Sequence, residues 1–162
     1  ATYLGFALPG IVVALALVFF AIRYTPSLYQ TLWMLVAAYT IRFLPEALAS
    51  VRASLMQIRP SLEDAAHGLG RRTPAVFATI TVPLARPGIA AGAALGFLTA
   101  MKELPATILL APTGFDTLAT SIWSATSEGF FARAAAPALL LVAVAAIPTA
   151  ILAIREAQFS HE

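Results

Sequence analysis

The chain has 162 residues and a formal net charge of +2, and 60% of its residues are hydrophobic while only 11% are charged. Soluble domains carry about 25% charged residues, so this composition indicates a protein that places its apolar surface in the hydrocarbon of a bilayer. The small net charge argues against a nucleic-acid partner, and the absence of cysteine excludes disulfide bonds, zinc ribbons and thiol catalysis.

Four apolar stretches follow one another along the chain: Ala1–Ile22, a stretch that begins near Leu28, Pro87–Met101 and Ala134–Ile154. A helix needs about 20 residues to cross the ~30 Å hydrocarbon core, so each stretch is a candidate membrane span. The sequence therefore predicts an all-α membrane protein, a polytopic transmembrane helical bundle with four spans.

The second stretch contains two charges and a proline. Arg42 and Glu46 lie one helical turn apart, so they are expected to form a structural pair near the inner end of the helix. Pro45 is expected to kink the helix or to end it nearby.

The distribution of basic residues predicts the orientation in the membrane. The segment between the second and third stretches is the one rich in arginine, with Arg52, Arg59, Arg71, Arg72 and Arg86. Since segments rich in lysine and arginine stay in the cytoplasm, this segment is expected to be cytoplasmic. The four helices then run outward, inward, outward and inward, which leaves the C-terminus in the cytoplasm.

The arginine-rich segment contains the pattern of a helical hairpin over Ser61–Pro83. Ser61 is expected to cap the first helix, with Asp64 completing an imperfect capping box. Gly70 lies where a helix ends with a left-handed residue. Thr73 is expected to cap the second helix with a proline after it, and Pro83 to end that helix. From periodicity alone, an amphipathic helical hairpin that lies on the membrane surface is an alternative interpretation.

The same segment resembles a known cytoplasmic motif. "SLEDAAHGLGRRTPAVFATITVP" is similar to the EAA loop of binding-protein-dependent importer permeases, whose pattern is Glu-Ala-Ala, three residues, Gly, nine residues, Ile-x-Leu-Pro. At the positions that correspond in spacing, this chain has Asp64, Ala65, Ala66, Gly70, Ile80 and Pro83. Asp64 and Val82 depart from the pattern, which has Glu and Leu there, and Glu63 supplies a second carboxylate beside Asp64.

The resemblance implies a permease subunit of an ATP-binding-cassette importer, with a MetI-like fold and a cytoplasmic EAA coupling-helix loop. In that family the loop docks on a cytoplasmic ATP-binding subunit, and a periplasmic solute-binding protein, a second permease domain or subunit and the lipid bilayer complete the assembly in the bacterial inner membrane. The chain itself lacks a GxxxxGK[ST] phosphate loop, so we expect a transport subunit, not an enzyme, without a cofactor. Because such domains usually have a further helix upstream, residues 1–162 are expected to form one permease domain that is incomplete at its N-terminus.

A second segment, Met101–Trp123, resembles the corresponding part of iron(III)-type permeases through its "KELPAT" and "GFDTLAT" runs. The resemblance implies ferric iron as the solute. Permeases for thiamine, phosphonate, sulfate or molybdate remain alternatives, as does a fragment of a secondary transporter or channel with an unrelated hairpin.

The charges at the end of the third stretch have two interpretations. Lys102 and Glu103 either mark the outer interface and reach toward water, or line the translocation path or its outer gate together with Pro105, which breaks the helix. A short outer helix is expected over Thr117–Ser127. The two histidines, His67 and His161, lie far apart in the sequence and predict no metal site.

Overall fold

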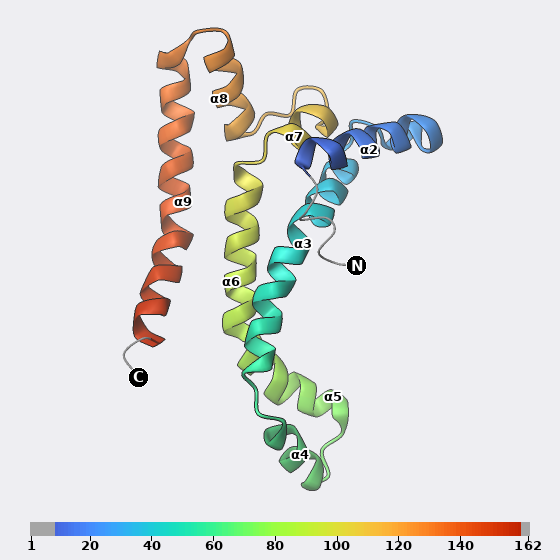
Figure 1. Ribbon diagram of the computed structural model, residues 1–162, viewed down its shortest axis with the longest axis vertical. Helices are drawn as coiled ribbons and strands as arrows, with labels where there is room; N and C mark the ends of the chain where they lie inside the picture. The colour runs from blue at the N-terminus through green and yellow to red at the C-terminus, as the bar shows by residue number, and fades with distance from the viewer. Residues whose placement is uncertain (1–8, 160–162) are drawn as a thin grey trace. The chain divides into compact units, whose positions relative to one another are not determined.

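The computed structural model describes residues 9–159, except for the side chains of residues 60 and 155–159. The regular structure within this range is helical throughout (Figure 1), in the chain order α2 (Gly10–Tyr24), η1 (Pro26–Leu28), α3 (Leu32–Met56), α4 (Pro60–Gly68), α5 (Thr73–Val76), η2 (Phe77–Thr81), α6 (Val82–Met101), α7 (Pro105–Leu110), α8 (Leu118–Ser127) and α9 (Phe131–Phe159). The predicted all-α class is confirmed.

Three helical segments are long and apolar enough to cross a membrane: Leu32–Met56, Thr73–Met101 and Phe131–Ile154. They correspond to the second, third and fourth predicted spans. The first predicted span differs, because α2 begins after Pro9 and has 15 residues, which is about 22 Å of helix and less than the ~30 Å core. Residues 1–8 of that span lie outside the described part of the chain.

The chain divides into two compact units, one formed by Ala1–Pro45 with Phe97–Glu162 and the other by Glu46–Gly96. Helices α3 and α6 each contribute residues to both units. Pro45 lies inside α3 and does not end it, and the division between the units falls directly after this proline.

In the first unit, α2, α7 and the beginning of α3 enclose a small apolar core. Its fully or nearly fully buried members are Ala14, Ala21, Met34, Leu35, Ala38, Ala106 and Leu110. Several are alanines, which let helices approach closely. The core therefore holds the short helix α7, which follows the break after α6, against α2 and α3.

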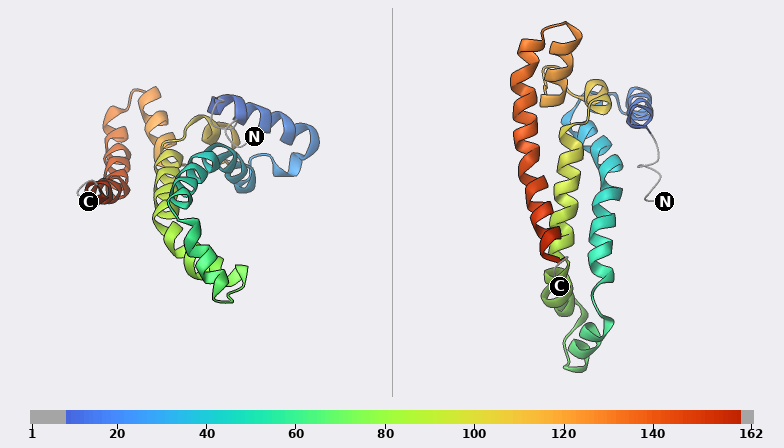
Figure 2. Two further views of the ribbon diagram at one scale, coloured as in Figure 1. Left: turned by 60° about the horizontal axis from the view of Figure 1, so that its bottom comes forward. Right: turned by 60° about the vertical axis from the view of Figure 1, so that its left-hand side comes forward.

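The other pair of helices in this unit is the hairpin of α8 and α9, whose side-by-side arrangement is visible in Figures 1 and 2. The predicted helix over Thr117–Ser127 is confirmed: Thr117 caps α8 by accepting the Thr120 N–H at 3.2 Å, and the Thr120 hydroxyl accepts the Thr117 N–H at 2.8 Å. Gly129 has a φ of +79°, a conformation that glycine adopts without steric cost, and it turns the chain into α9.

In the second unit, the end of α3 packs against the beginning of α6 through small residues. A Cβ atom built on Gly92 would lie 2.7 Å from the Ala47 carbonyl oxygen, and one on Gly88 would lie 2.7 Å from the Ser50 carbonyl oxygen and overlap the Ser54 side chain. Only glycine fits at these two positions without moving the helices apart.

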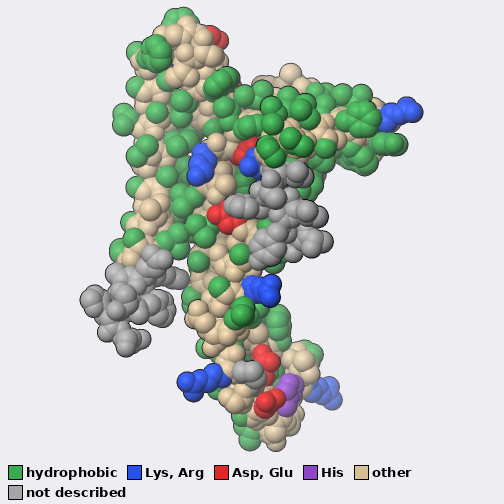
Figure 3. All heavy atoms as spheres, in the orientation of Figure 1, with side chains coloured by type: hydrophobic (Ala, Val, Ile, Leu, Met, Phe, Trp, Pro, Cys, Tyr) green, Lys and Arg blue, Asp and Glu red, His purple; other side chains and the backbone are tan. Residues whose placement is uncertain are grey.

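Helix α9 exposes large apolar side chains along its length, including Leu139, Leu140, Val142, Ile147 and Ile151. Figure 3 shows hydrophobic side chains on α9 and α2 where a water-soluble protein would carry charges. This surface suits contact with lipid or with another apolar protein surface.

Candidate functional site

The first helix of the predicted coupling hairpin, α4, begins two residues earlier than the sequence suggested. Arg59 is its N-cap residue and Pro60 its first helical residue, so the prediction of Ser61 as the cap is wrong. Proline suits the first helical position because its φ is already helical and its missing N–H would have no partner there. Asp64, which was expected to complete a capping box with Ser61, is exposed on the helix.

The turn at the end of α4 has the predicted left-handed glycine. Gly70 has a φ of +77°. Its N–H donates to the His67 carbonyl oxygen at 2.9 Å, and the Arg71 N–H donates to the Ala66 carbonyl oxygen at 3.1 Å. These two bonds form a complete Schellman motif, which satisfies the last carbonyl groups of the helix.

The second half of the hairpin differs from the prediction at both ends. Arg72, not Thr73, is the N-cap residue of α5, and no side-chain bond caps the helix. Pro83 does not end the helical segment, because α5 passes through the π-helical turn η2 into α6 and the whole segment runs from Thr73 to Met101.

The π-helical turn gives a physical reason for the uninterrupted segment. A proline in an α-helix clashes with the carbonyl group four residues before it, which for Pro83 belongs to Thr79. In η2 the Val82 N–H donates to the Phe77 carbonyl oxygen, five residues back. This wider turn shifts the preceding carbonyl groups away from the proline ring, so the helix continues.

Two polar contacts tie the hairpin together. The Thr81 hydroxyl donates to Glu63 Oε1 at 2.7 Å, and Arg71 Nη1 donates to the Thr79 hydroxyl at 3.2 Å. Ala66 and Val76 are the buried apolar residues of the hairpin, 6% and 2% exposed. Glu63 is therefore engaged inside the hairpin. Sequence reasoning missed Thr81, because it occupies the variable position between Ile80 and Val82 in the motif.

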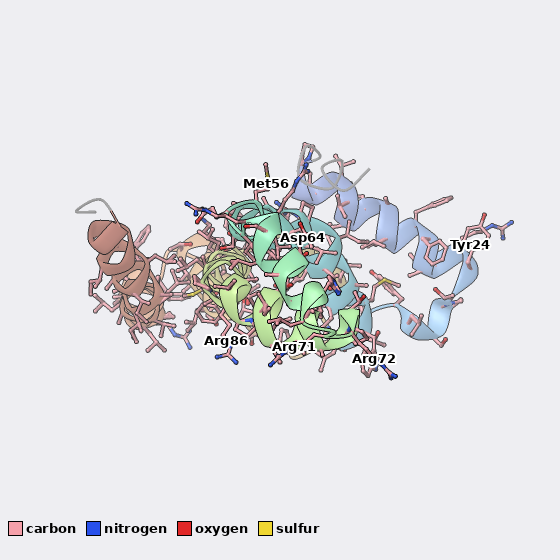
Figure 4. The ribbon with its side chains drawn as sticks, turned by 90° about the horizontal axis from the view of Figure 1, so that it is seen from below. Tyr24, Met56, Asp64, Arg71, Arg72 and Arg86 are labelled. Atoms are coloured by element: carbon pink, nitrogen blue, oxygen red, sulfur yellow. The ribbon has the colours of Figure 1, made fainter. Side chains whose placement is uncertain are left out.

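The outer surface of the hairpin carries both apolar and charged side chains. Among the apolar residues Leu62, Ala65, Ala66 and Leu69 of α4 and its C-cap, only Ala66 is buried, whereas Leu62 is 46% and Leu69 is 84% exposed. Ala65 and Asp64 are exposed beside them, and Ile80 and Pro83 are half-buried. Figure 4 shows the side chains of Arg71, Arg72 and Arg86 extending away from the ribbon. Such a surface, with large apolar side chains rimmed by charges, suits a protein partner.

The charges at the end of α6 separate into one exposed and one buried residue. Lys102 is exposed, and Pro105 is exposed at the first position of α7. Glu103 is only 6% exposed, and its Oε1 lies 2.7 Å from Nη1 of Arg42. This ion pair joins Arg42 to a residue 61 positions further along the chain, a partner that the sequence did not indicate.

Three further residues surround this ion pair, and no sequence pattern indicated that any of them would lie there. The Tyr39 and Thr107 hydroxyl groups lie 2.5 Å apart, and the Thr107 hydroxyl also donates to the Glu103 carbonyl oxygen at 2.8 Å. Gly10 lies so close that a Cβ atom there would overlap the Arg42 guanidinium. These contacts join elements that are distant in the sequence, so no local pattern indicates them.

Among the residues that the structure describes, no three His, Cys, Asp or Glu side chains gather where they could hold a metal ion. His67 lies on α4, where its Nδ1 is 3.1 Å from the Arg71 carbonyl oxygen, while His161 falls outside the described residues.

Comparison with known proteins gives matches over almost the whole chain. The family model described as "Binding-protein-dependent transport system inner membrane component" matches residues 1–160. An Fe(3+)-transport system permease protein of Haemophilus influenzae is 43% identical over 93% of this chain and 30% of its own length. A putative 2-aminoethylphosphonate transport system permease protein of Salmonella paratyphi A is 30% identical over 88% of this chain and 54% of its own length.

A molybdenum transport system permease protein of Haemophilus influenzae is 45% identical over a shorter region, 40% of this chain. The chain thus spans about a third of the length of the first of these relatives and about half of the second.

Proposed function

Because the chain belongs to the family of binding-protein-dependent transport system inner membrane components and is a multi-pass inner-membrane protein, we propose that it forms part of the translocation path of an ATP-driven importer. A separate cytoplasmic ATP-binding subunit supplies the energy, a periplasmic solute-binding protein delivers the solute, and a second permease domain or subunit completes the path. The chain contributes no ATPase site of its own.

The observation that carries this proposal is the geometry of the hairpin between α3 and α6. Its first helix presents Leu62, Leu69 and Asp64 outward, and its turn is fixed by the Schellman motif at Gly70. Its second helix continues without interruption to Met101. A partner that moves α4 therefore acts on a stiff element that is continuous with a membrane span, which is what coupling to an ATPase requires.

Within the hairpin we assign the docking role to Asp64, Ala65 and the exposed leucines, and a supporting role to the residues that set its shape. Glu63 holds η2 through Thr81, and Gly70 sets the turn. Ala66, Ile80 and Pro83 are buried or half-buried and lie within the hairpin. On this proposal the hairpin and the C-terminus lie in the cytoplasm, as the arginine distribution predicts.

A charge reversal tests the docking role. Asp64→Lys is expected to lower the amount of ATP-binding subunit that co-purifies with the complete permease, because it places a positive charge near the N-terminus of α4 and on the docking surface. Asp116→Lys is the matched control, since Asp116 is also an exposed aspartate but lies outside the hairpin. Equal co-purification with both variants would remove the assignment of the hairpin as the docking element.

We propose ferric iron as the solute. The support is the "KELPAT" segment at Lys102–Thr107 together with the 43% identity to the Fe(3+)-transport system permease protein. The decisive measurement is uptake by the reconstituted transporter with its cognate binding protein, with ferric iron, 2-aminoethylphosphonate and molybdate tested side by side. Transport of either of the other two solutes without transport of iron would contradict the assignment of ferric iron as the solute. It would not contradict the assignment of the chain as a permease subunit.

We further propose that the break between α6 and α7 forms part of the outer gate. Helix α6 ends at Met101 and α7 begins at Pro105, so the α-helical hydrogen-bond ladder is interrupted between them, and the Glu103 carbonyl oxygen accepts a side-chain hydroxyl, that of Thr107. At membrane depth such a break in the helix is tolerated only beside protein or a watery cavity. Lys102 is the exposed charge at this break, whereas Glu103 turns inward to Arg42.

A further inference from the structure

The buried polar cluster around Glu103 ties the break after α6 to α3 at two points. The first is the ion pair of Glu103 Oε1 with Arg42 Nη1 at 2.7 Å. The same oxygen accepts the N–H of Ala106, in the first turn of α7, at 3.2 Å. One carboxylate thus joins a residue of α3 to the beginning of α7.

The second tie uses the main chain of Glu103. Its carbonyl oxygen accepts the Thr107 hydroxyl at 2.8 Å, and that hydroxyl lies 2.5 Å from the hydroxyl of Tyr39. Tyr39 and Arg42 are three residues apart on α3, so their side chains leave the same face of the helix. Both the side chain and the backbone of Glu103 are therefore held by one face of α3.

Helix α2 closes the cluster with a glycine. A Cβ atom on Gly10 would overlap the Arg42 guanidinium and lie 3.1 Å from Glu103 Oε1, so a side chain there would displace the guanidinium from its present position. The side chains of Arg42 and Glu103 are 21% and 7% exposed. Exclusion of water strengthens the attraction within such a pair and also raises the cost of leaving either charge alone.

A largely buried ion pair contributes little net stability to the packing of two helices, because apolar residues of similar volume stabilise the folded state as well or better. Charges inside membrane segments are rare and mark functional positions. The cluster also lies at the break between the span that ends at Met101 and the helix that follows it, where Lys102 is exposed. These features favour a role in transport over a role in packing alone.

We propose that Arg42 is a positioning residue for transport, which acts through Glu103 to fix the break between α6 and α7 against α3 and so to place Lys102 at the outer end of the path. Gly10 and the Tyr39–Thr107 pair support the same arrangement. This inference rests on the proposed importer function and extends it to residues of α2 and α3.

The test is a double-mutant cycle in the complete transporter, reconstituted with its ATP-binding subunit and cognate binding protein. Arg42→Gln and Glu103→Gln each leave one buried charge without its partner, and each is expected to lower the maximal rate of ferric uptake roughly tenfold. The double variant removes both charges and leaves two amides that can bond to each other. Its rate is expected to equal or exceed that of the worse single variant, and not to fall to the product of the two losses.

Three readouts separate positioning from simple loss of folded protein. The amount of inserted, assembled transporter should stay normal, the concentration of loaded binding protein at half-maximal uptake should change little, and more ATP should be hydrolysed per solute imported. Gly10→Ala should reproduce the defect of Arg42→Gln, whereas Gly96→Ala, at a glycine with open space around it, should not.

The outcomes that overturn the inference are distinct. If uptake falls only in proportion to the amount of assembled transporter, the cluster has a role in packing alone. If the loss in the double variant equals the product of the two single losses, Arg42 and Glu103 act independently. Normal uptake in Arg42→Gln would overturn this inference alone. Absence of ATP-dependent uptake of any of the three solutes by the unaltered transporter would overturn the proposed function and this inference with it.

Discussion

The contact between Gly92 and the backbone of Ala47 makes the packing of α3 on α6 testable with a single methyl group. In Gly92→Ala the new Cβ atom would lie 2.7 Å from the Ala47 carbonyl oxygen and 3.2 Å from the Ala47 Cα. A carbon and a carbonyl oxygen in contact are separated by about 3.3–3.6 Å, so the two helices must move apart by about 0.6 Å or more. Neither atom belongs to a flexible side chain that can turn away.

The expected cost follows from a comparison with Gly96→Ala on the same helix. Overpacking by one methyl group costs about 1–3 kcal/mol. Replacement of glycine by alanine also favours a helix by about 1 kcal/mol, but this gain is common to both variants. Because no atom lies within 4 Å of a Cβ on Gly96, the difference between the two variants equals the packing cost. Gly92→Ala should therefore be about 1–3 kcal/mol less stable than Gly96→Ala.

The assay is equilibrium unfolding of the complete permease in mixed micelles with increasing fractions of a denaturing detergent, followed by the helical circular dichroism signal. Gly96→Ala is expected to unfold at the midpoint of the unaltered protein or above it, and Gly92→Ala clearly below it. Coincident midpoints for the two variants would refute the close backbone contact between α3 and α6.

Three further predictions concern the hairpin. Gly70→Ala should weaken co-purification of the ATP-binding subunit, because a side chain at a φ of +77° costs about 1–2 kcal/mol, whereas Gly68→Ala, with an open site and no positive φ, should not. Thr81→Val removes the 2.7 Å bond to Glu63 and should cost about 1 kcal/mol, which is measurable as faster amide hydrogen exchange in α4; unchanged exchange would contradict the contact. A single cysteine introduced as Arg72→Cys should resist an impermeant thiol reagent added outside intact cells, and labelling from outside would reverse the predicted orientation.

The parts of this fold that the sequence predicts correctly are those decided by composition and by strong local signals. Apolar length alone located the spans that contain α3, α6 and α9. Pro105 located the end of α6, since a helix rarely continues past the residue before a proline. Gly70 located a left-handed turn, because glycine adopts that conformation without steric cost.

The errors arise where a distant or cooperative contact overrides a local rule. The ion pair of Arg42 with Glu103 has no local signal in the sequence, because the two residues are 61 positions apart and meet only through the packing of the helices. Pro83 was expected to end the helix, but the π-helical turn before it accommodates the proline ring and the helix continues.

The π-helical turn η2 also sets a rotational register. Each backbone ring in a π-helix closes over one residue more than in an α-helix, so residues 77–81 contain the equivalent of one inserted residue. Removal of a single residue from this turn would restore a regular α-helix and rotate Thr73–Val76 by about 100° around the axis of α6. The one extra residue in this turn therefore determines the direction in which α6 presents the hairpin, independently of every side chain on the docking surface.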